Sequence, residues 1–180
     1  KDTNDVLSLM EYSQKNSVPL LARGGGSSQC GQTVGESVVI DYSKHQNKIL
    51  ELNVEEKYVW VQPGVVLDHL NAYLKPHGLW FPVDVSTSSR ATIGGMSANN
   101  SCGSRSLYYG NMVHNVLAIE AILDDGSIFN FDQINKNYLA TKNNQDRLYK
   151  IIDKFIDVRQ QVGGEIDANW PTTQRRVGGY

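Results

Sequence analysis

Apolar residues recur at helical spacing in three parts of the chain. They fall three or four positions apart within residues 6–10, 66–74 and 148–155. That spacing gathers the apolar side chains on one side of a helix, so we predict an amphipathic helix at each place. The first ends before Pro19, and Pro76 closes the second, because proline cannot continue a helix.

Short apolar runs between polar stretches predict strands. The runs lie at residues 19–22, 38–40, 49–52 and 58–61. We expect the second strand to be buried and to end at Asp41. We expect the last two strands to form a pair, joined by the polar stretch 53–57.

A further pair of strands is predicted around Asp124-Asp125-Gly126-Ser127. The apolar runs 116–123 and 128–131 flank this sequence. Asp-Gly between apolar runs is a strong hairpin signal, and both residues of the tight turn would take positive φ. Beyond the last predicted helix, we expect residues 163–180 to be irregular.

Two stretches rich in glycine and small polar residues interrupt these elements. The first, residues 23–35, follows a predicted strand, and the second, residues 81–110, has little periodicity. A long, weakly regular segment inside a compact chain is typically functional or disordered. The apolar Ile93 and Met96 within the second stretch favour a packed segment.

The composition narrows the classes of function. The chain has 180 residues, of which 40% are hydrophobic and 20% charged, as is ordinary for a globular protein. The 17 Lys and Arg against 19 Asp and Glu give a net charge of −2, which argues against nucleic-acid binding, since such proteins carry basic patches. No run of about 18 apolar residues occurs, so we expect no membrane span.

The cysteines and histidines indicate neither a disulfide framework nor a metal site. Cys30 and Cys102 are far apart, and the four histidines lack the spacing of metal ligands. We expect no metal and a reducing, cytoplasmic location, with a peripheral position at the inner face of a membrane left open. For His114 an ordinary structural role is favoured over a role at a cofactor. Because the chain starts at Lys1 rather than Met, we expect it to be part of a longer protein.

The first polar stretch opens with Arg23-Gly24-Gly25-Gly26-Ser27-Ser28. Successive glycines can turn several backbone N–H groups into one concavity, which would bind an anion such as a pyrophosphate. The two hydroxyls add donors, and Arg23 adds positive charge. Taken alone, however, the loop is equally compatible with a flexible connector.

Two familiar nucleotide-binding motifs nearly fit this loop and fail. The pattern G-x-G-x-x-G needs a glycine where Gln29 stands, and no helix pattern follows. Residues 26–31 have the glycine spacing of a Walker loop, but Gln32 replaces the required lysine. The sequence therefore supports neither a Rossmann dinucleotide site nor an ATPase loop.

The second polar stretch offers many neutral hydrogen-bonding groups between residues 82 and 110, and little charge. Small side chains allow close backbone approach, and amides can satisfy ring carbonyls and nitrogens, so a large, polar, uncharged ligand would fit. A surface loop rich in Ser and Asn is the ordinary alternative.

Three motifs together resemble a known family. They are RGGGSSQCGQ (23–32), PVDVSTSSRATIGGMSANNSCGSRSLYYG (82–110) and NVLAIEAILDDGS (115–127). Over residues 1–132, their order and spacing resemble the FAD-binding domain of the FAD-linked oxidase family, of the vanillyl-alcohol oxidase/p-cresol methylhydroxylase type. The second motif is most similar to the D-2-hydroxyacid (D-lactate or D-2-hydroxyglutarate) dehydrogenases of that family, in particular long ones fused to an iron–sulfur domain.

The resemblance implies a fold and an activity. It implies an α+β, two-lobed FAD-binding domain over residues 1–132, and over 133–180 a helical extension that starts the connection to an absent substrate domain. The intact protein would be an FAD-dependent dehydrogenase that oxidises a small D-2-hydroxyacid by hydride transfer to FAD. Its electron acceptor is unknown, and any iron–sulfur cluster would lie outside this chain. We expect the chain alone to bind FAD weakly or not at all, and to have no turnover.

The resemblance also assigns cofactor-binding residues, but no catalytic ones. Arg23 to Ser28 would cradle the FAD pyrophosphate, with Gln32 nearby. The flavin and its ribityl chain would be lined by Pro82, Asp84, Ser88, Ser89, Thr92, Gly94, Gly95, Asn100 and Gly103, and Gly110 and Val116 would close over the cofactor. Some relatives attach the flavin covalently through a histidine in the glycine loop. Since residues 23–35 contain no histidine, we expect non-covalent FAD.

Two other functions remain open at this point. One is UDP-N-acetylenolpyruvoylglucosamine reductase, an NADPH-dependent flavoenzyme with a similar flavin fold, although the stretch NNSCGSRS and the Asp-Asp-Gly hairpin favour the hydroxyacid group. The other is a non-catalytic module that kept the fold without the flavin.

Overall fold

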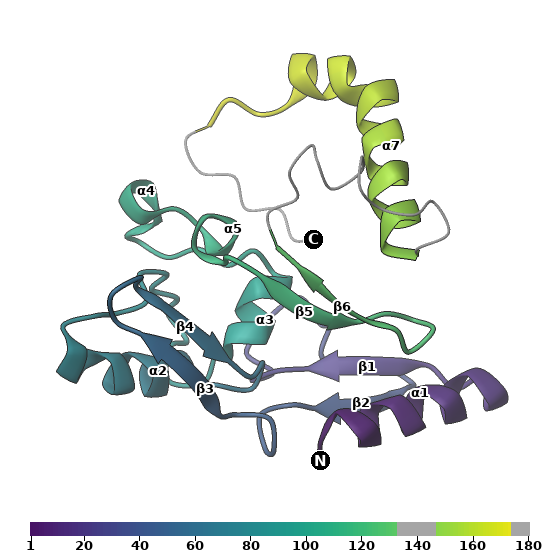
Figure 1. The fold of residues 1–180 in the computed structure, drawn as a ribbon, viewed down its shortest axis with the longest axis horizontal. Coiled ribbons are helices and arrows are strands. Elements are labelled where there is room, and N and C mark those ends of the chain that lie inside the picture. The colour runs from purple at the N-terminus through teal and green to yellow at the C-terminus, as the bar shows by residue number, and fades with distance from the viewer. Residues whose placement is uncertain (133–146, 174–180) are drawn as a thin grey trace. The chain divides into compact units, whose positions relative to one another are not determined.

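A computed structural model describes residues 1–132 and 147–173, and these divide into two units (Figure 1). One unit contains residues 1–116 and 124–126, and the other contains residues 117–123, 127–132 and 147–173. In the first unit one helix precedes four short strands, and several short helices follow them, whereas the two strands of a hairpin and one long helix make up the second. The mixed α+β class predicted from the sequence is therefore confirmed.

The first helix, α1 (Thr3–Asn16), lies where the apolar spacing predicts it. The Asp2 side chain accepts the backbone N–H of Asp5 at 3.1 Å, and the Asp5 side chain accepts that of Asp2 at 3.3 Å. This capping box satisfies backbone donors that the start of a helix otherwise leaves unpaired. Ser17, with a φ of 55°, ends the helix before Pro19.

The first polar stretch connects two parallel strands. β1 (Leu20–Arg23) pairs with β2 (Val38–Asp41), with Leu20 opposite Val38 and Arg23 opposite Asp41. Both strands lie where predicted, but the expectation that β2 is buried is wrong, because Val38 and Val39 are 37% and 41% exposed. Among the described residues this sheet has only two strands, so both are edge strands and their side chains are incompletely covered.

A hairpin and a helix form the next part of the first unit. β3 (Ile49–Asn53) and β4 (Tyr58–Val61) pair in antiparallel fashion, as predicted. The helix α2 (Leu67–Leu74) follows and buries Leu70 and Leu74 against the apolar side chains of this hairpin. A short 3₁₀ turn, η1 (Lys75–His77), continues from α2.

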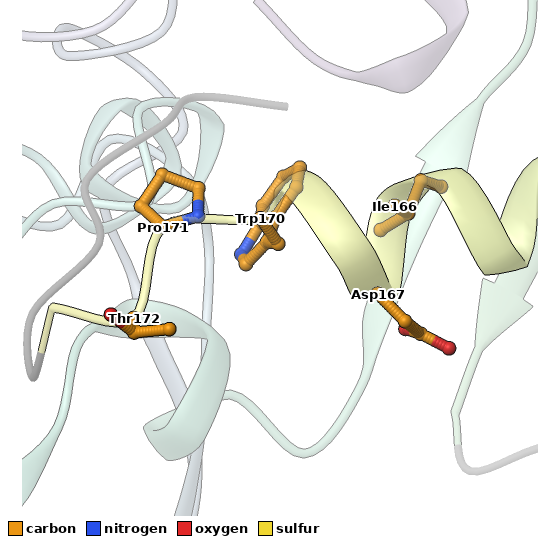
Figure 2. Close-up of a pocket in the computed structure, with 5 residues that line it drawn as sticks. All are labelled: Ile166, Asp167, Trp170, Pro171 and Thr172. Carbon is orange, nitrogen blue, oxygen red and sulfur yellow. The ribbon is translucent and has the colours of Figure 1, made fainter.

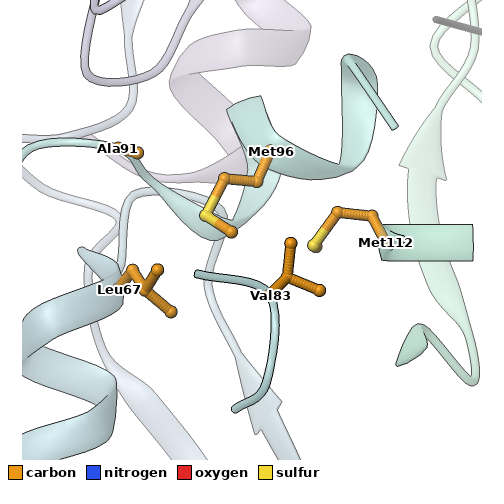
Figure 3. Packing of buried hydrophobic residues seen from close by; sticks show 5 residues of the cluster. All are labelled: Leu67, Val83, Ala91, Met96 and Met112. Atoms are coloured by element: carbon orange, nitrogen blue, oxygen red, sulfur yellow. The ribbon is translucent and has the colours of Figure 1, made fainter. Parts of the chain in front are cut away.

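The second polar stretch is packed, as Ile93 and Met96 indicated. It contains the short helices α3 (Ile93–Ala98) and α4 (Ser106–Tyr109), and α5 (Met112–Asn115) comes directly after it. Met96 is 2% exposed and belongs to a buried cluster. Figure 3 shows that cluster, which consists of Leu67, Val83, Ala91, Met96 and Met112. This stretch therefore builds much of the core of the first unit.

The predicted hairpin of the second unit is confirmed, with a different turn. β5 (Ile119–Ile122) pairs with β6 (Ile128–Phe131) in antiparallel fashion. The expectation that both Asp125 and Gly126 take positive φ is wrong: of the two, only Gly126 does, at 83°. The Leu123 N–H donates to the Ser127 carbonyl at 2.8 Å, which closes a three-residue loop. Such loops need a single glycine in the left-handed region.

The last helix, α7 (Arg147–Asn169), is longer than the sequence suggested. The expectation of irregular structure from Gly163 onward is wrong for residues 163–169. Glycine is a weak helix former. Here the Arg159 side chain lies against Gly163, and its guanidinium pairs with Asp167, beyond Gly163, at 3.0 Å. Within the described ranges, no helix is long and apolar enough to cross a membrane.

Candidate functional site

The two polar stretches meet at one cavity of about 220 Å³ in the first unit. The first stretch and the end of β1 contribute Ala22, Arg23, Gly24, Gly25, Gly26, Ser27, Ser28, Gln32 and Thr33. The second contributes Val85, Thr87, Ala91, Thr92, Gly95, Met96, Ala98, Asn99 and Ser101. Segments separated by more than fifty residues in sequence therefore form the walls of a single site.

Glycine is required in the first stretch because the second stretch packs directly against it. A β-carbon on Gly24 would overlap the hydroxyl oxygen of Thr92, and one on Gly25 would overlap the carbonyl oxygen of Arg90. Gly26 has a φ of 63°, which disfavours other residues. The glycines thus bring the backbone of the loop against the second stretch as well as shaping its turn.

Polar side chains also connect the two stretches. Thr92 is 1% exposed and caps α3, where its hydroxyl oxygen accepts the Gly95 N–H at 3.4 Å. The hydroxyl groups of Ser27 and Thr87 lie 3.4 Å apart, within hydrogen-bond distance. The Thr92 contact stays within the second stretch, whereas the Ser27–Thr87 pair joins the glycine loop to it.

Arg23 places a positive charge at the edge of this loop. Its carbonyl accepts the Tyr42 N–H at 3.0 Å at the end of β1, and its guanidinium lies against Gly26. Its Nε is buried and has no hydrogen-bond partner among the described residues. Because an unpaired buried donor is costly, an anion such as a diphosphate would relieve this cost. The glycine turn, the two serine hydroxyls and the unpaired Nε therefore fit the diphosphate of FAD.

Asp41 is a fixed negative charge close to Arg23. A hydrogen bond from the Ser43 hydroxyl, at 2.6 Å, holds the pKa of Asp41 below its ordinary value of 3.8. Burial opposes this shift, while the charges of Arg23 and Lys44 add to it. Asp41 is therefore anionic at neutral pH, beside the strand end that carries Arg23.

The cavity brings together part of the predicted set. The predicted residues that line it are Arg23, Gly24, Gly25, Gly26, Ser27, Ser28, Gln32, Thr92 and Gly95. The predicted residues outside its described lining are Pro82, Asp84, Ser88, Ser89, Gly94, Asn100, Gly103, Gly110 and Val116. Two of these lie close to other parts of the chain: Gly94 packs on Pro63, and Gly110 on His114.

Sequence reasoning missed several residues that line the cavity. They are Ala22, Thr33, Val85, Thr87, Ala91, Met96, Ala98, Asn99 and Ser101. Asn99 and Ser101 are the informative cases, because they flank the predicted Asn100. The Asn100 side chain accepts the Val113 N–H at 3.0 Å, and its φ is 46°. The tolerance of asparagine for left-handed backbone was the one available sign that Asn100 makes a turn.

His114, for which the sequence favours an ordinary structural role, makes a contact of that kind. The Nδ1 atom of His114 accepts the Asn111 N–H at 3.0 Å, which caps α5. In residues 1–132 and 147–173, no group of His, Cys, Asp and Glu side chains could hold a metal ion.

A second cavity, of about 360 Å³, lies at the end of α7 (Figure 2). It is lined by Ile166, Asp167, Trp170, Pro171 and Thr172. The Asp167 carboxylate is exposed and already paired with Arg159. Although this cavity is larger, the polar groups that converge on the first cavity have no counterpart in its described lining, so the first is the better candidate site.

The cavity lies within the part of the chain that matches a known family. Residues 1–132 match the family described as FAD binding domain. The chain is 43% identical over 130 residues to D-2-hydroxyglutarate dehydrogenase of Haemophilus influenzae. That alignment covers 72% of this chain and 13% of the relative. It is 36% identical over 179 residues to D-2-hydroxyglutarate dehydrogenase of Escherichia coli, covering 97% and 17%. It is 39% identical over 132 residues to the mitochondrial cytochrome D-lactate dehydrogenase of Kluyveromyces lactis, covering 71% and 23%.

Solved structures share the fold. The 6-hydroxy-D-nicotine oxidase from Arthrobacter nicotinovorans superposes with a TM-score of 0.67 at 18% identity, covering 77% of this chain and 30% of that one. Alkyldihydroxyacetonephosphate synthase superposes with a TM-score of 0.62 at 23% identity, covering 79% and 28%. The chain spans only 13% to 18% of the length of the D-2-hydroxyglutarate dehydrogenases it matches.

Proposed function

Because the chain belongs to the FAD binding domain family, with a fold of the vanillyl-alcohol oxidase/p-cresol methylhydroxylase type, we propose that it is the flavin-binding part of a dehydrogenase that oxidises a D-2-hydroxyacid. The observation that carries this proposal is the single cavity lined by both polar stretches. The names of the curated relatives supply the substrate class, a small 2-hydroxyacid. They also favour this function over the NADPH-dependent reductase.

In this proposal the loop from Arg23 to Ser28 binds the diphosphate of FAD. The backbone N–H groups of the glycines, the two serine hydroxyls and the Arg23 guanidinium are all donors, as a diphosphate requires. The Nε of Arg23, unpaired among the described residues, would gain a partner. Gln32 lies at the same cavity and adds an amide.

The second stretch then binds the uncharged part of the cofactor. Its lining offers the hydroxyls of Thr87, Thr92 and Ser101 and the amide of Asn99, beside apolar surface from Val85 and Met96. When bound, FAD accepts the hydride from the substrate Cα, and the protein supplies binding and orientation. The residues that bind the substrate and remove its proton would belong to the remainder of a longer protein, since this chain spans under a fifth of the D-2-hydroxyglutarate dehydrogenases it matches.

We further propose that residues 1–132 are the FAD-binding domain and that 133–180 lead toward the substrate domain. The family match ends at residue 132, and α7 lies beyond it. The two cysteines in the described residues, Cys30 and Cys102, are free thiols, in keeping with a reducing, cytoplasmic location.

We propose that the FAD is held non-covalently. The described lining of the cavity contains neither histidine nor cysteine to which a flavin could be attached. Acid precipitation of the flavin-loaded protein should release the yellow colour into the supernatant. Colour that stays in the pellet would contradict non-covalent binding.

The experiment that tests the function uses the protein expressed from its complete reading frame. We expect it to retain flavin absorbance through desalting, and we expect D-2-hydroxyglutarate or D-lactate, added without oxygen, to bleach the flavin bands. The L-enantiomers serve as the control and should leave the bands unchanged. A protein that never binds flavin, or whose flavin no D-2-hydroxyacid reduces, would contradict the proposal.

A further inference from the structure

Both carboxylate oxygens of Asp84 accept hydrogen bonds from a neighbouring turn, residues 103–105. Its Oδ2 accepts the Ser104 hydroxyl at 2.7 Å, and its Oδ1 accepts the backbone N–H of Arg105 at 3.0 Å. The Nε of Arg105 lies 3.7 Å from Oδ2. The Asp84 side chain is 28% exposed and that of Arg105 is 60% exposed, so these contacts lie at the surface of the unit.

Gly103 shows how closely the two segments approach. A β-carbon at this position would overlap both the side-chain Oδ1 and the carbonyl oxygen of Asp84. The Gly103 N–H donates to the Ser106 hydroxyl at 2.9 Å, which continues the turn into α4. The backbone of residues 103–105 therefore packs directly against Asp84 and is hydrogen-bonded to it.

Asp84 itself is held in place by the core. Its neighbour Val83 is completely buried in the cluster shown in Figure 3. On the far side of the turn, the Ser101 carbonyl accepts the Met112 N–H at 3.0 Å, and Met112 belongs to the same cluster. Asn99 and Ser101, which line the cavity, come just before the turn that Asp84 contacts. Their backbone also bonds to Met112 and, through the Ser101 N–H, to the Met96 carbonyl at 2.9 Å.

We propose that Asp84 is a positioning residue, which holds the turn 103–105 so that Asn99 and Ser101 stay oriented toward the cavity. This assignment rests on the proposed function, namely that the cavity binds FAD. It differs from the role that the sequence implied for Asp84, a direct lining of the flavin. In this assignment Asp84 acts through Ser104 and Arg105 rather than directly on the cofactor.

The shape of asparagine allows the two roles to be separated. In Asp84→Asn, the amide oxygen can still accept the Arg105 N–H, and the amide NH₂ can donate to the Ser104 hydroxyl, which is also an acceptor. Asp84→Ala removes both hydrogen bonds. Ser104→Ala removes one of them and is the milder variant if Asp84→Ala folds poorly. Asp68→Ala, on the exposed side of α2, is the matched control.

The test uses the protein from the complete reading frame with two measurements. In flavin-free protein, we expect Asp84→Ala to speed hydrogen exchange of the Arg105 amide by about tenfold, while Asp84→Asn and Asp68→Ala leave it unchanged. In FAD titrations, we expect Asp84→Ala to raise the Kd at least about tenfold and Asp84→Asn to raise it less than about threefold. Ser104→Ala should add nothing further to Asp84→Ala.

Each contrary outcome has a distinct meaning. If the unmutated protein does not bind FAD, the proposed function fails, and this assignment fails with it. If it binds FAD but Asp84→Asn is as weak as Asp84→Ala, the charge itself is needed and the positioning role is overturned. Additive losses from Asp84→Ala and Ser104→Ala would overturn it as well, because they would show that the two residues act independently.

Discussion

The two stretches that line the cavity use their residues in different ways. In the first, every residue from Arg23 to Ser28 lines the cavity, and glycine brings the backbone itself to the site. In the second, cavity-lining residues alternate with residues that build the core or hold a turn. Asn99 and Ser101 line the cavity, whereas Asn100 between them bonds to Val113. A stretch that also forms the core must therefore divide its polar residues between binding and support.

The largest expected effect concerns the core role of the second stretch. Met96 is 2% exposed and contributes to both the buried cluster and the cavity wall. We expect Met96→Ala to lower the free energy of unfolding by about 2–5 kcal/mol, because it leaves a cavity. Urea denaturation followed by circular dichroism measures this loss. Leu107→Ala, at a residue 68% exposed in the same stretch, is the control and should change it by less than about 0.5 kcal/mol. Equal effects would contradict the packed core.

The next effect concerns the backbone of the glycine loop. In Gly25→Ala the new methyl group meets the carbonyl oxygen of Arg90, a backbone atom that cannot move aside easily. We expect a loss of about 1–3 kcal/mol in the free energy of unfolding and a Kd for FAD raised at least about tenfold. In Gly35→Ala the nearest atom is the Ser37 hydroxyl oxygen at 3.7 Å, so this variant should match the unmutated protein. Similar behaviour of the two variants would show that the loop is a loose connector.

The third prediction separates binding from support between two adjacent asparagines. Asn100→Ala loses the acceptor for the Val113 N–H and places alanine at a φ of 46°, so we expect it to cost about 1–2 kcal/mol of stability. Asn99→Ala should leave the thermal midpoint nearly unchanged and weaken FAD binding by about threefold to tenfold. Thermal unfolding and FAD titration of both variants check this. The reverse pattern would show that Asn100 is the residue that binds.

The smallest effect is the pH dependence contributed by Asp84. Burial alone would raise its pKa, but hydrogen bonds from the Ser104 hydroxyl and the Arg105 N–H outweigh burial and leave the pKa below 3.8. Ionised Asp84 therefore stabilises the folded state above its unfolded pKa, and this stability is lost as the pH falls through the lower folded pKa. We expect the difference in urea midpoint between the unmutated protein and Asp84→Asn to shrink from pH 7 to pH 3. An unchanged difference would show that the charge of Asp84 contributes nothing to stability.

Much of the fold could be predicted because its signals are local. The apolar spacing before Pro19, the paired runs at 49–52 and 58–61, and Asp-Gly in the hairpin each specify an element within a few residues. The predictions were wrong where the exposure or the length of an element depends on residues outside that element's local pattern. The exposure of β2 depends on how few strands its sheet has among the described residues, and in α7 the Arg159 side chain lies against Gly163 and pairs with Asp167 beyond it.

The candidate site shows the same limit. The glycine loop could be predicted because its function depends on the lack of side chains, which the sequence displays directly. In the second stretch, Asp84, Gly94 and Gly103 are predicted to line the flavin, and each also packs against or bonds to another part of the chain. Serine, asparagine and glycine serve both purposes equally well. The core contacts of Val83, Met96 and Met112, which join positions far apart in the sequence, are not visible in the residue types of this stretch.

Amide hydrogen exchange of the complete protein, with and without FAD, tests most directly whether the two stretches bind one cofactor together. We predict that FAD slows exchange in residues 24–28 and in residues 92–101 over the same concentration range, while the β3–β4 turn at 54–57 exchanges as before. Protection of one stretch without the other, or of neither, would contradict the account.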